Sequence, residues 1–289
     1  MNIDVMKSKI FDYRGIDLLN GIVPHPGYIK INNTSTNIPK YIHQTWKSTE
    51  MSEEYASWAL SWKQYHPDYL HILWLDNDND LLAQEFPEYV SIYNNFPLII
   101  EKLDFTRLLY LYKFGGIYAD LDYIAYKNVP DTFTEIGDVY INTAYKNPRN
   151  FITEVFQNSL MISEPNNNFI KLIIDNITFL ENDIYNNTQN SLFNALTNPI
   201  TSRLFNEILV LNITGPNMID KSFIINNISN NTSNVIVPLN SEYFSGPISF
   251  HVQKSTWGSM SNILYVIYPI ILIIMIIIII MYMIIKRFK

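Results

Sequence analysis

The 289-residue chain contains no cysteine. This absence excludes disulfide bonds, thiolate zinc sites and cysteine nucleophiles. Basic residues are also scarce: 20 Lys and Arg stand against 27 Asp and Glu, for a formal net charge of -7. A chain with this balance carries no broad positive surface, so nucleic-acid binding is not expected.

The first twenty residues lack the apolar segment of a signal peptide. One long uncharged apolar run does occur, at residues 263–285, and as a helix it would be ~34 Å long, which matches a bilayer core. We therefore expect a single-pass transmembrane helix followed by a basic tail, residues 286–289. Post-translational tail anchoring would leave the main domain in the cytosol, whereas the positive-inside rule would place it in the lumen, so its side stays open.

Between the ends, residues 1–37 are expected to form an N-terminal extension and residues 38–260 a single α/β domain. Strand-like and helix-like patterns alternate from residue 40 to residue 94, with the acidic run at 76–80 expected as a solvated turn. This alternation predicts a Rossmann-like, mostly parallel sheet with helices on both faces. Ligands would then bind at the carboxyl ends of the strands.

A helix is predicted at residues 101–114, ending at Gly115 and Gly116. Asp104 and Arg107 lie three positions apart on this helix and therefore share a face. They can pair with each other or act together on a ligand, and the spacing leaves both possibilities open.

A strand is predicted at residues 117–122, and its period of two would put Asp120 and Asp122 on the same side. Two adjacent carboxylates repel each other unless a cation lies between them, so the pair indicates a divalent metal site. Oxygen ligands favour Mn²⁺ or Mg²⁺ in such a site.

Residues 103–122, LDFTRLLYLYKFGGIYADLD, resemble the signature of the Och1-like glycosyltransferases, also called family 32. Similar segments follow the family's usual order at residues 38–47, 61–74, 157–169 and 214–216, and at His251 with Ser255 and Trp257. The resemblance implies a GT-A type fold and metal-dependent sugar transfer from a nucleotide-sugar, with retention of anomeric configuration.

The resemblance also implies roles for individual residues. Asp104 and Arg107 would contact the sugar and diphosphate of the donor, and Asp120 and Asp122 would bind the metal, with Asp120 also facing the donor. These four are the expected catalytic residues.

Further residues would complete the donor site by the same resemblance. Gln44, Thr45 and Trp46 would line the nucleotide pocket, and His251 and Trp257 would belong to a closing C-terminal segment. An imidazole can serve as an additional metal ligand, and an indole can cover the donor.

Two other questions remain open in the sequence. His43 alternates with Gln44 along its strand, so either His43 or Gln44 faces the ligand. His25, His66 and His71 lack partners at ligand spacing and are expected to be core or surface residues.

The expected reaction moves a hexose to a membrane-associated lipid or glycan acceptor. Mannose from GDP-mannose is favoured, with a UDP-hexose as the alternative donor. The alternatives are a galactosyl- or glucosyltransferase acting on protein or glycan, and a membrane-tethered non-catalytic or phosphohydrolase-like module. An endomembrane of the Golgi or endoplasmic reticulum is the expected location.

Overall fold

The computed structural model describes residues 22–23, 38–48, 50–129, 138–144, 155–188, 210–229 and 235–254. The expected transmembrane segment at 263–285, the basic tail at 286–289, and Trp257 lie outside these residues. Within the residues that are described, no helix is both long enough and apolar enough to cross a membrane.

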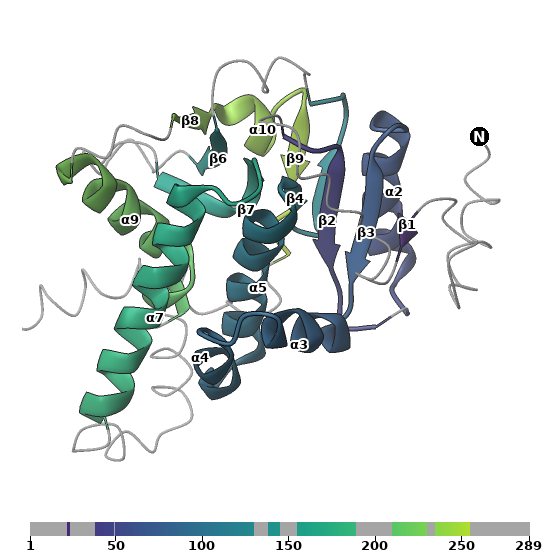
Figure 1. Ribbon diagram of the computed structural model, residues 1–289. Helices are drawn as coiled ribbons and strands as arrows, with labels where there is room; N and C mark the ends of the chain where they lie inside the picture. Colours follow the sequence, from purple (N-terminus) through teal and green to yellow (C-terminus); the bar gives the residue numbers. More distant parts are fainter. Residues whose placement is uncertain are drawn as a thin grey trace, which may run out of the picture.

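A seven-stranded mixed sheet forms the centre of the described structure (Figure 1). In spatial order its strands are β1 (Ile22–Val23), β3 (Leu70–Trp74), β2 (Tyr41–Thr45), β4 (Gly116–Ala119), β7 (Val155–Ser163), β6 (Val139–Ala144) and β8 (Ile236–Leu239). Neighbouring strands are parallel except at β7, which is antiparallel to both β4 and β6. The sheet is therefore mostly parallel, as predicted, and its edge strand β1 comes from the segment that was expected to be an extension.

Helices cover both faces of this sheet. They are α2 (Glu53–Tyr65), α3 (Asp76–Gln84), α4 (Val90–Asn95), α5 (Ile99–Phe114), α7 (Asn168–Thr188), α9 (Pro216–Ile228) and α10 (Ser241–Ser245). The period of two in β4 separates the two cores: Tyr118 packs into the core that contains α5 and α7, whereas Ile117 packs with Trp62 of α2 on the opposite face. Figure 1 shows α5 alongside β4, with α7 next to it.

The acidic run at 76–80 is not a solvated turn, because it forms the first residues of α3. Asp78 is buried, and its carboxylate accepts a hydrogen bond from the backbone N–H of Leu75, 3.0 Å away. Negative side chains are stabilised at this end of a helix, where backbone N–H groups lack intrahelical partners. The run is therefore a helix start.

The junction between α5 and β4 depends on two glycines with positive φ, 65° at Gly115 and 98° at Gly116. A Cβ on Gly116 would lie only 2.7 Å from the carbonyl oxygen of Tyr41 in β2. The chain can therefore turn tightly from α5 into the sheet, so that β4 runs back along α5 and its carboxyl end comes close to Arg107.

A second, two-stranded sheet follows directly. It pairs β5 (Tyr123–Ala125) antiparallel with β9 (Ser249–His251). This pairing brings the C-terminal part of the described chain next to the segment after β4.

Candidate active site

Asp120 and Asp122 lie just beyond the carboxyl end of β4, in the turn that leads to β5. The prediction that they lie within a strand is wrong: β4 ends at Ala119, and the N–H of Tyr123 donates to the carbonyl oxygen of Asp120, 3.0 Å away, to close the turn. The two carboxylates therefore come together through a turn and not through strand alternation. Their place at the ends of parallel strands β2 and β4 is the one expected for a ligand site.

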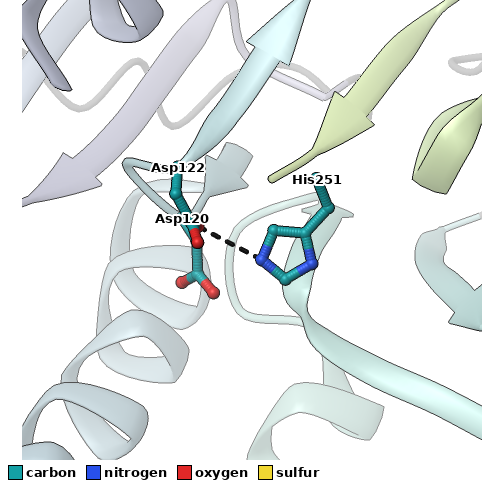
Figure 2. A group of neighbouring side chains, drawn as sticks. All are labelled: Asp120, Asp122 and His251. Carbon is teal, nitrogen blue, oxygen red and sulfur yellow. Dashed lines mark hydrogen bonds and ion pairs between the residues drawn. The ribbon is translucent and has the colours of Figure 1, made fainter. Parts of the chain in front are cut away.

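His251 of β9 joins these two carboxylates (Figure 2). Its Nε2 lies 3.1 Å from Oδ1 of Asp122, and the backbone N–H of Lys254 donates to Oδ2 of the same carboxylate at 3.0 Å. One ligand atom from each of Asp120, Asp122 and His251 lies within 4.8 Å of the others. The structure thus brings together the three residues that were predicted to bind metal.

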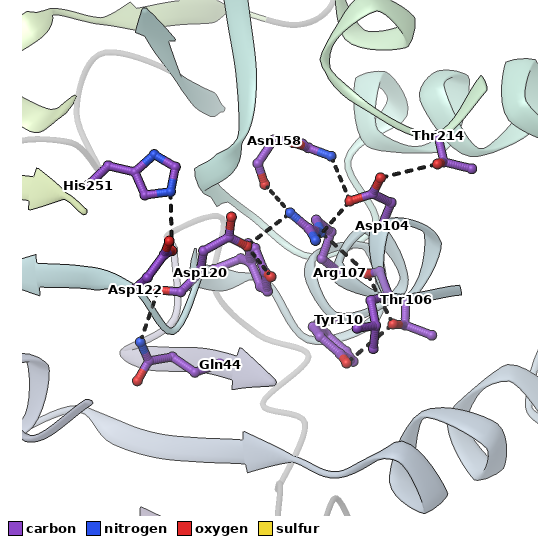
Figure 3. Close-up of polar contacts among 12 residues, drawn as sticks. Gln44, Asp104, Thr106, Arg107, Tyr110, Asp120, Asp122, Asn158, Thr214 and His251 are labelled. Atoms are coloured by element: carbon purple, nitrogen blue, oxygen red, sulfur yellow. Dashed lines mark hydrogen bonds and ion pairs between the residues drawn. The ribbon is translucent and has the colours of Figure 1, made fainter. Parts of the chain in front are cut away.

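Asp104 and Arg107 reach the same site from α5 (Figure 3). The Arg107 guanidinium lies 2.8 Å from Oδ1 of Asp104 and 3.0 Å from Oδ1 of Asp120, and it also donates to the carbonyl oxygen of Asn158 at 2.9 Å. Both α5 side chains are only 5% exposed. Arg107 therefore connects the helix to the first carboxylate of the Asp-x-Asp turn.

Three further residues complete this network and were not identified from the sequence. Asn158 donates to Oδ1 of Asp104 at 2.9 Å and Thr214 to Oδ2 at 3.1 Å, while the Tyr118 hydroxyl donates to Oδ1 of Asp120 at 2.6 Å. Tyr118 precedes Asp120 by two residues. Because side chains two positions apart on a strand point to the same face, this spacing could have suggested that the two side chains lie together.

Asn158 lies within residues 157–169, a segment that resembles the family, but no pattern in that segment singled out its side chain. It lies in β7 where the pairing with β6 shifts from Ile141 opposite Met161 to Thr143 opposite Phe156. This bulge adds residues to β7, and bulges re-aim side chains next to functional sites. The side chain of Asn158 consequently reaches Asp104 on α5.

The electrostatics of the site reflect three carboxylates around one guanidinium. Burial raises the pKa of Asp104 to about 6, although Arg107 opposes the shift. Burial likewise raises the pKa of Asp120 above its ordinary value, against the effect of Arg107 and reinforced by Asp122. Burial alone would raise the pKa of Asp122 too, but hydrogen bonding and charge from His251 hold it below its ordinary value.

These observations fit a divalent cation. Oδ1 of Asp120 takes the bonds from Arg107 and Tyr118, and within the described part of the chain its Oδ2 accepts no hydrogen bond. A cation beside Asp120 would offset the burial and the repulsion from Asp122 that favour a proton there. Two carboxylates and an imidazole are suitable ligands for Mn²⁺.

The residues predicted for the nucleotide pocket differ in exposure. Gln44 is fully buried: its Oε1 accepts a hydrogen bond from the Nε2–H of His71 at 2.7 Å, and its Nε2 donates to the Asp120 carbonyl oxygen at 3.4 Å. Thr45 is also buried and donates to the Trp74 carbonyl oxygen at 3.0 Å. Trp46 packs on Tyr55, with 4.5 Å between ring centroids, and is partly exposed. Of the three residues it is therefore the one whose side chain a ligand could contact.

His43 faces α5 and is structural. Its Nδ1 accepts from the indole N–H of Trp74 at 3.0 Å, so its Nε2 carries the proton and donates to the Gly115 carbonyl oxygen at 2.9 Å. Burial lowers the pKa of His43 to about 4. His66 and His71 are buried core residues, whereas His25 lies outside the described residues.

Residues 52–140 match the family described as "Glycosyltransferase sugar-binding region containing DXD motif". This span holds Asp104, Arg107, Asp120 and Asp122, the residues that converge in the structure. The resemblance to family 32 is thereby confirmed for the segment that carries the motif.

Curated relatives agree with this match. The chain is 42% identical over 92 residues to inositol phosphoceramide mannosyltransferase 3 of Schizosaccharomyces pombe, covering 32% of this chain and 26% of the relative. An uncharacterised glycosyltransferase of Acanthamoeba polyphaga mimivirus is 33% identical over 164 residues, covering 53% of this chain and 61% of the relative. The matched part thus spans about a quarter of the length of the first fungal relatives.

Among solved structures, the PaToxG glycosyltransferase aligns with 80% of this chain and 79% of its own, at 18% sequence identity and a TM-score of 0.42.

Proposed function

We propose that this chain is a metal-dependent, retaining hexosyltransferase that uses a nucleotide-sugar donor, with mannose as the favoured sugar. The observation that carries the proposal is the convergence of Asp120, Asp122 and His251 at the end of β4, within 4.8 Å of one another. The match of residues 52–140 to a DXD sugar-binding region supports it independently.

In this proposal Asp120, Asp122 and His251 hold Mn²⁺ or Mg²⁺. When bound there, such an ion neutralises charge on the diphosphate of the donor as the glycosidic bond breaks. The ligand set suits this role because the excess of negative charge in the site would otherwise repel a diphosphate.

Arg107 supplies a fixed positive charge to the proposed site. Burial by itself would lower its pKa, but Asp120, Tyr118 and Asp104 raise the pKa above its ordinary value, so the guanidinium stays charged. Its bonds to Asp104 and Asp120 fix it beside the metal ligands, where a fixed cation can act on a phosphate or sugar oxygen without reorganising. Asp104 holds the guanidinium in this orientation.

The names of the relatives support a choice of donor and acceptor. Several of them are named mannosyltransferases, which favours GDP-mannose over a UDP-hexose. One acceptor, inositol phosphoceramide, occurs in their names, and another relative is named an initiation-specific α-1,6-mannosyltransferase. We therefore propose a membrane-associated lipid or glycan as the acceptor. The apolar run at 263–285 would hold the enzyme at an endomembrane where such acceptors occur.

The test is a comparison of donors and metals. Purified chain is incubated with GDP-mannose, UDP-glucose or UDP-galactose, with and without Mn²⁺, and release of free sugar or transfer to inositol phosphoceramide is followed by mass spectrometry. We expect turnover with GDP-mannose that EDTA abolishes. Asp122→Asn should lower the rate by roughly a hundredfold or more, because a metal ligand is lost.

Asp68→Asn serves as the matched control, since Asp68 is exposed and bonds only to Lys40 within the described residues. It should retain the rate of the parent chain. Turnover of every donor at equal rate in EDTA, or full activity of Asp122→Asn, would contradict the proposal. Turnover of a UDP-hexose alone would change the proposed donor and leave the proposed metal dependence and site residues unchanged.

A further inference from the structure

We infer that Tyr123 is a positioning residue for the metal site: its ring, fixed by Asn142, holds the imidazole of His251 in the orientation that directs Nε2 toward Asp122. The inference rests on the proposed function and adds residues outside the Asp-x-Asp motif.

A histidine that binds metal is usually oriented by a hydrogen bond from its second ring nitrogen to a carboxylate, a carbonyl or water. His251 lacks this support within the described residues, because its Nδ1 is buried there without a hydrogen-bond partner. Its Nε2 faces Asp122 at 3.1 Å. The orientation of the ring must therefore come from packing.

The packing is extensive on two sides. The ring of Tyr123 stacks on the imidazole with 4.5 Å between centroids and only 8° between the planes. Phe244 of α10 meets the imidazole edge-on, at 5.3 Å and 78°. A ring held by one face and one edge cannot rotate about its outer torsion without losing both contacts.

Tyr123 is itself held at both ends. Its hydroxyl accepts a hydrogen bond of 2.7 Å from Nδ2 of Asn142, and its carbonyl oxygen accepts one of 2.9 Å from the indole of Trp62. The side chain is fully buried. It is therefore a rigid surface and not a mobile aromatic.

The backbone reinforces this placement. Tyr123 lies directly opposite His251 in the β5–β9 ladder, and the N–H of Val252 donates to the carbonyl oxygen of Asp122 at 3.0 Å. Opposite residues in an antiparallel ladder have neighbouring side chains on one face. The residue after the Asp-x-Asp motif thus carries the support for the third ligand.

The experiment measures Mn²⁺ binding directly, by electron paramagnetic resonance of free Mn²⁺ at a fixed neutral pH, on the full-length chain. Tyr123→Leu removes the flat ring and should weaken Mn²⁺ affinity about tenfold, the size typical for loss of a residue that supports a metal ligand. Tyr123→Phe keeps the ring and should retain the affinity of the parent chain within about threefold.

A double variant separates positioning from general damage. If Tyr123 acts through the imidazole, Tyr123→Leu should have no further effect on Mn²⁺ affinity in a chain that already carries His251→Ala. Phe250→Leu is the matched control, since Phe250 is on the same strand as His251 and exposed, and it should leave affinity unchanged.

Because Tyr123 is buried, circular dichroism and thermal melting accompany each variant. Should Tyr123→Leu fail to fold, Phe244→Leu tests the same idea from the other side of the imidazole, with an expected loss of about tenfold in Mn²⁺ affinity. Phe244 is only partly buried and so tolerates the change better.

The outcomes distinguish the inference from the proposed function. Parent-level Mn²⁺ affinity in folded Tyr123→Leu, or in Phe244→Leu where that variant is the test, overturns the inference alone. An equal loss with and without His251 also overturns it. A parent chain that binds no Mn²⁺ overturns the inference together with the metal site.

Discussion

At the scale of single residues, the least ordinary feature is the burial of Asp104. Its carboxylate is satisfied by Arg107, Asn158 and Thr214, and burial still raises its pKa to about 6. The folded chain therefore binds a proton at Asp104 more tightly than the unfolded chain does. The contribution of Asp104 to stability is fully present below the ordinary pKa of 3.8 and is lost as pH rises through about 6.

This predicts a pH-dependent effect of Asp104→Asn. The free energy of unfolding of the parent chain relative to the variant should fall by up to about 3 kcal/mol between about pH 4 and about pH 7.5. Urea unfolding in EDTA, followed by circular dichroism, measures the difference. Thr214→Val removes a donor that lowers the pKa of Asp104, so it should move the pH midpoint upward. A difference that is constant across this range would contradict the prediction.

The sequence anticipated much at this scale and missed specific contacts. The spacing of Asp104 and Arg107 predicted that they share a helix face, and of the two possibilities that it left open the structure shows the ion pair. Asn158 could not be found in this way, because the bulge in β7 that turns its side chain toward α5 depends on pairing with a distant strand.

At the scale of elements, the connection from α5 to β4 fixes the distance between Arg107 and Asp120. The helix ends at Phe114 and the strand begins at Gly116, so one residue, Gly115, separates them. The sequence predicted this helix end from its two glycines. It placed Asp120 and Asp122 in the wrong element, because a period of two does not reveal where a strand stops and a turn begins.

We predict that Gly116→Ala destabilises the fold by at least about 2 kcal/mol. The added Cβ meets the Tyr41 carbonyl oxygen at 2.7 Å, and a φ of 98° is unfavourable for alanine. The measurement is the free energy of unfolding in urea. Ala119→Gly, in the same strand, is the control and should cost only about 0.5–1 kcal/mol. A smaller loss in Gly116→Ala than in the control would show that β4 adjusts freely.

At the scale of the whole molecule, the described domain and the apolar run at 263–285 are separate parts of the chain by sequence. All five residues that form the central network of carboxylates, guanidinium and imidazole lie between residues 104 and 251. We therefore predict that deleting residues 263–289 yields a chain that partitions into the aqueous phase and binds Mn²⁺ within about threefold of the parent.

A longer deletion, residues 249–289, provides the contrast. It removes β9 with His251 and the backbone N–H of Lys254, so Mn²⁺ affinity should fall by at least about tenfold. Detergent partitioning and Mn²⁺ titration check the pair of deletions. Aggregation of the shorter deletion, or equal Mn²⁺ affinity in both, would place the domain boundary elsewhere.

The alternation of strands and helices predicted the α/β class and the mostly parallel sheet. It could not predict that β7 runs antiparallel or that β1 joins at the edge, since these depend on which strands meet in space. The resemblance to family 32 supplied His251 as a member of the site; local pattern in the sequence offered no reason to bring it to Asp122.

The pairing of β5 with β9 also determines when, during synthesis of the chain, the proposed metal ligands can come together. Asp122 and His251 are 129 residues apart, so a ribosome adding about 5–20 residues per second needs on the order of ten seconds to go from one to the other. Strands β2, β3 and β4 are complete before that interval begins, whereas the ligand trio assigned to the metal exists only once the last described strand has been made. A chain released early would carry the carboxylates without the imidazole, and capture of Mn²⁺ by the full trio is therefore a property of finished chains.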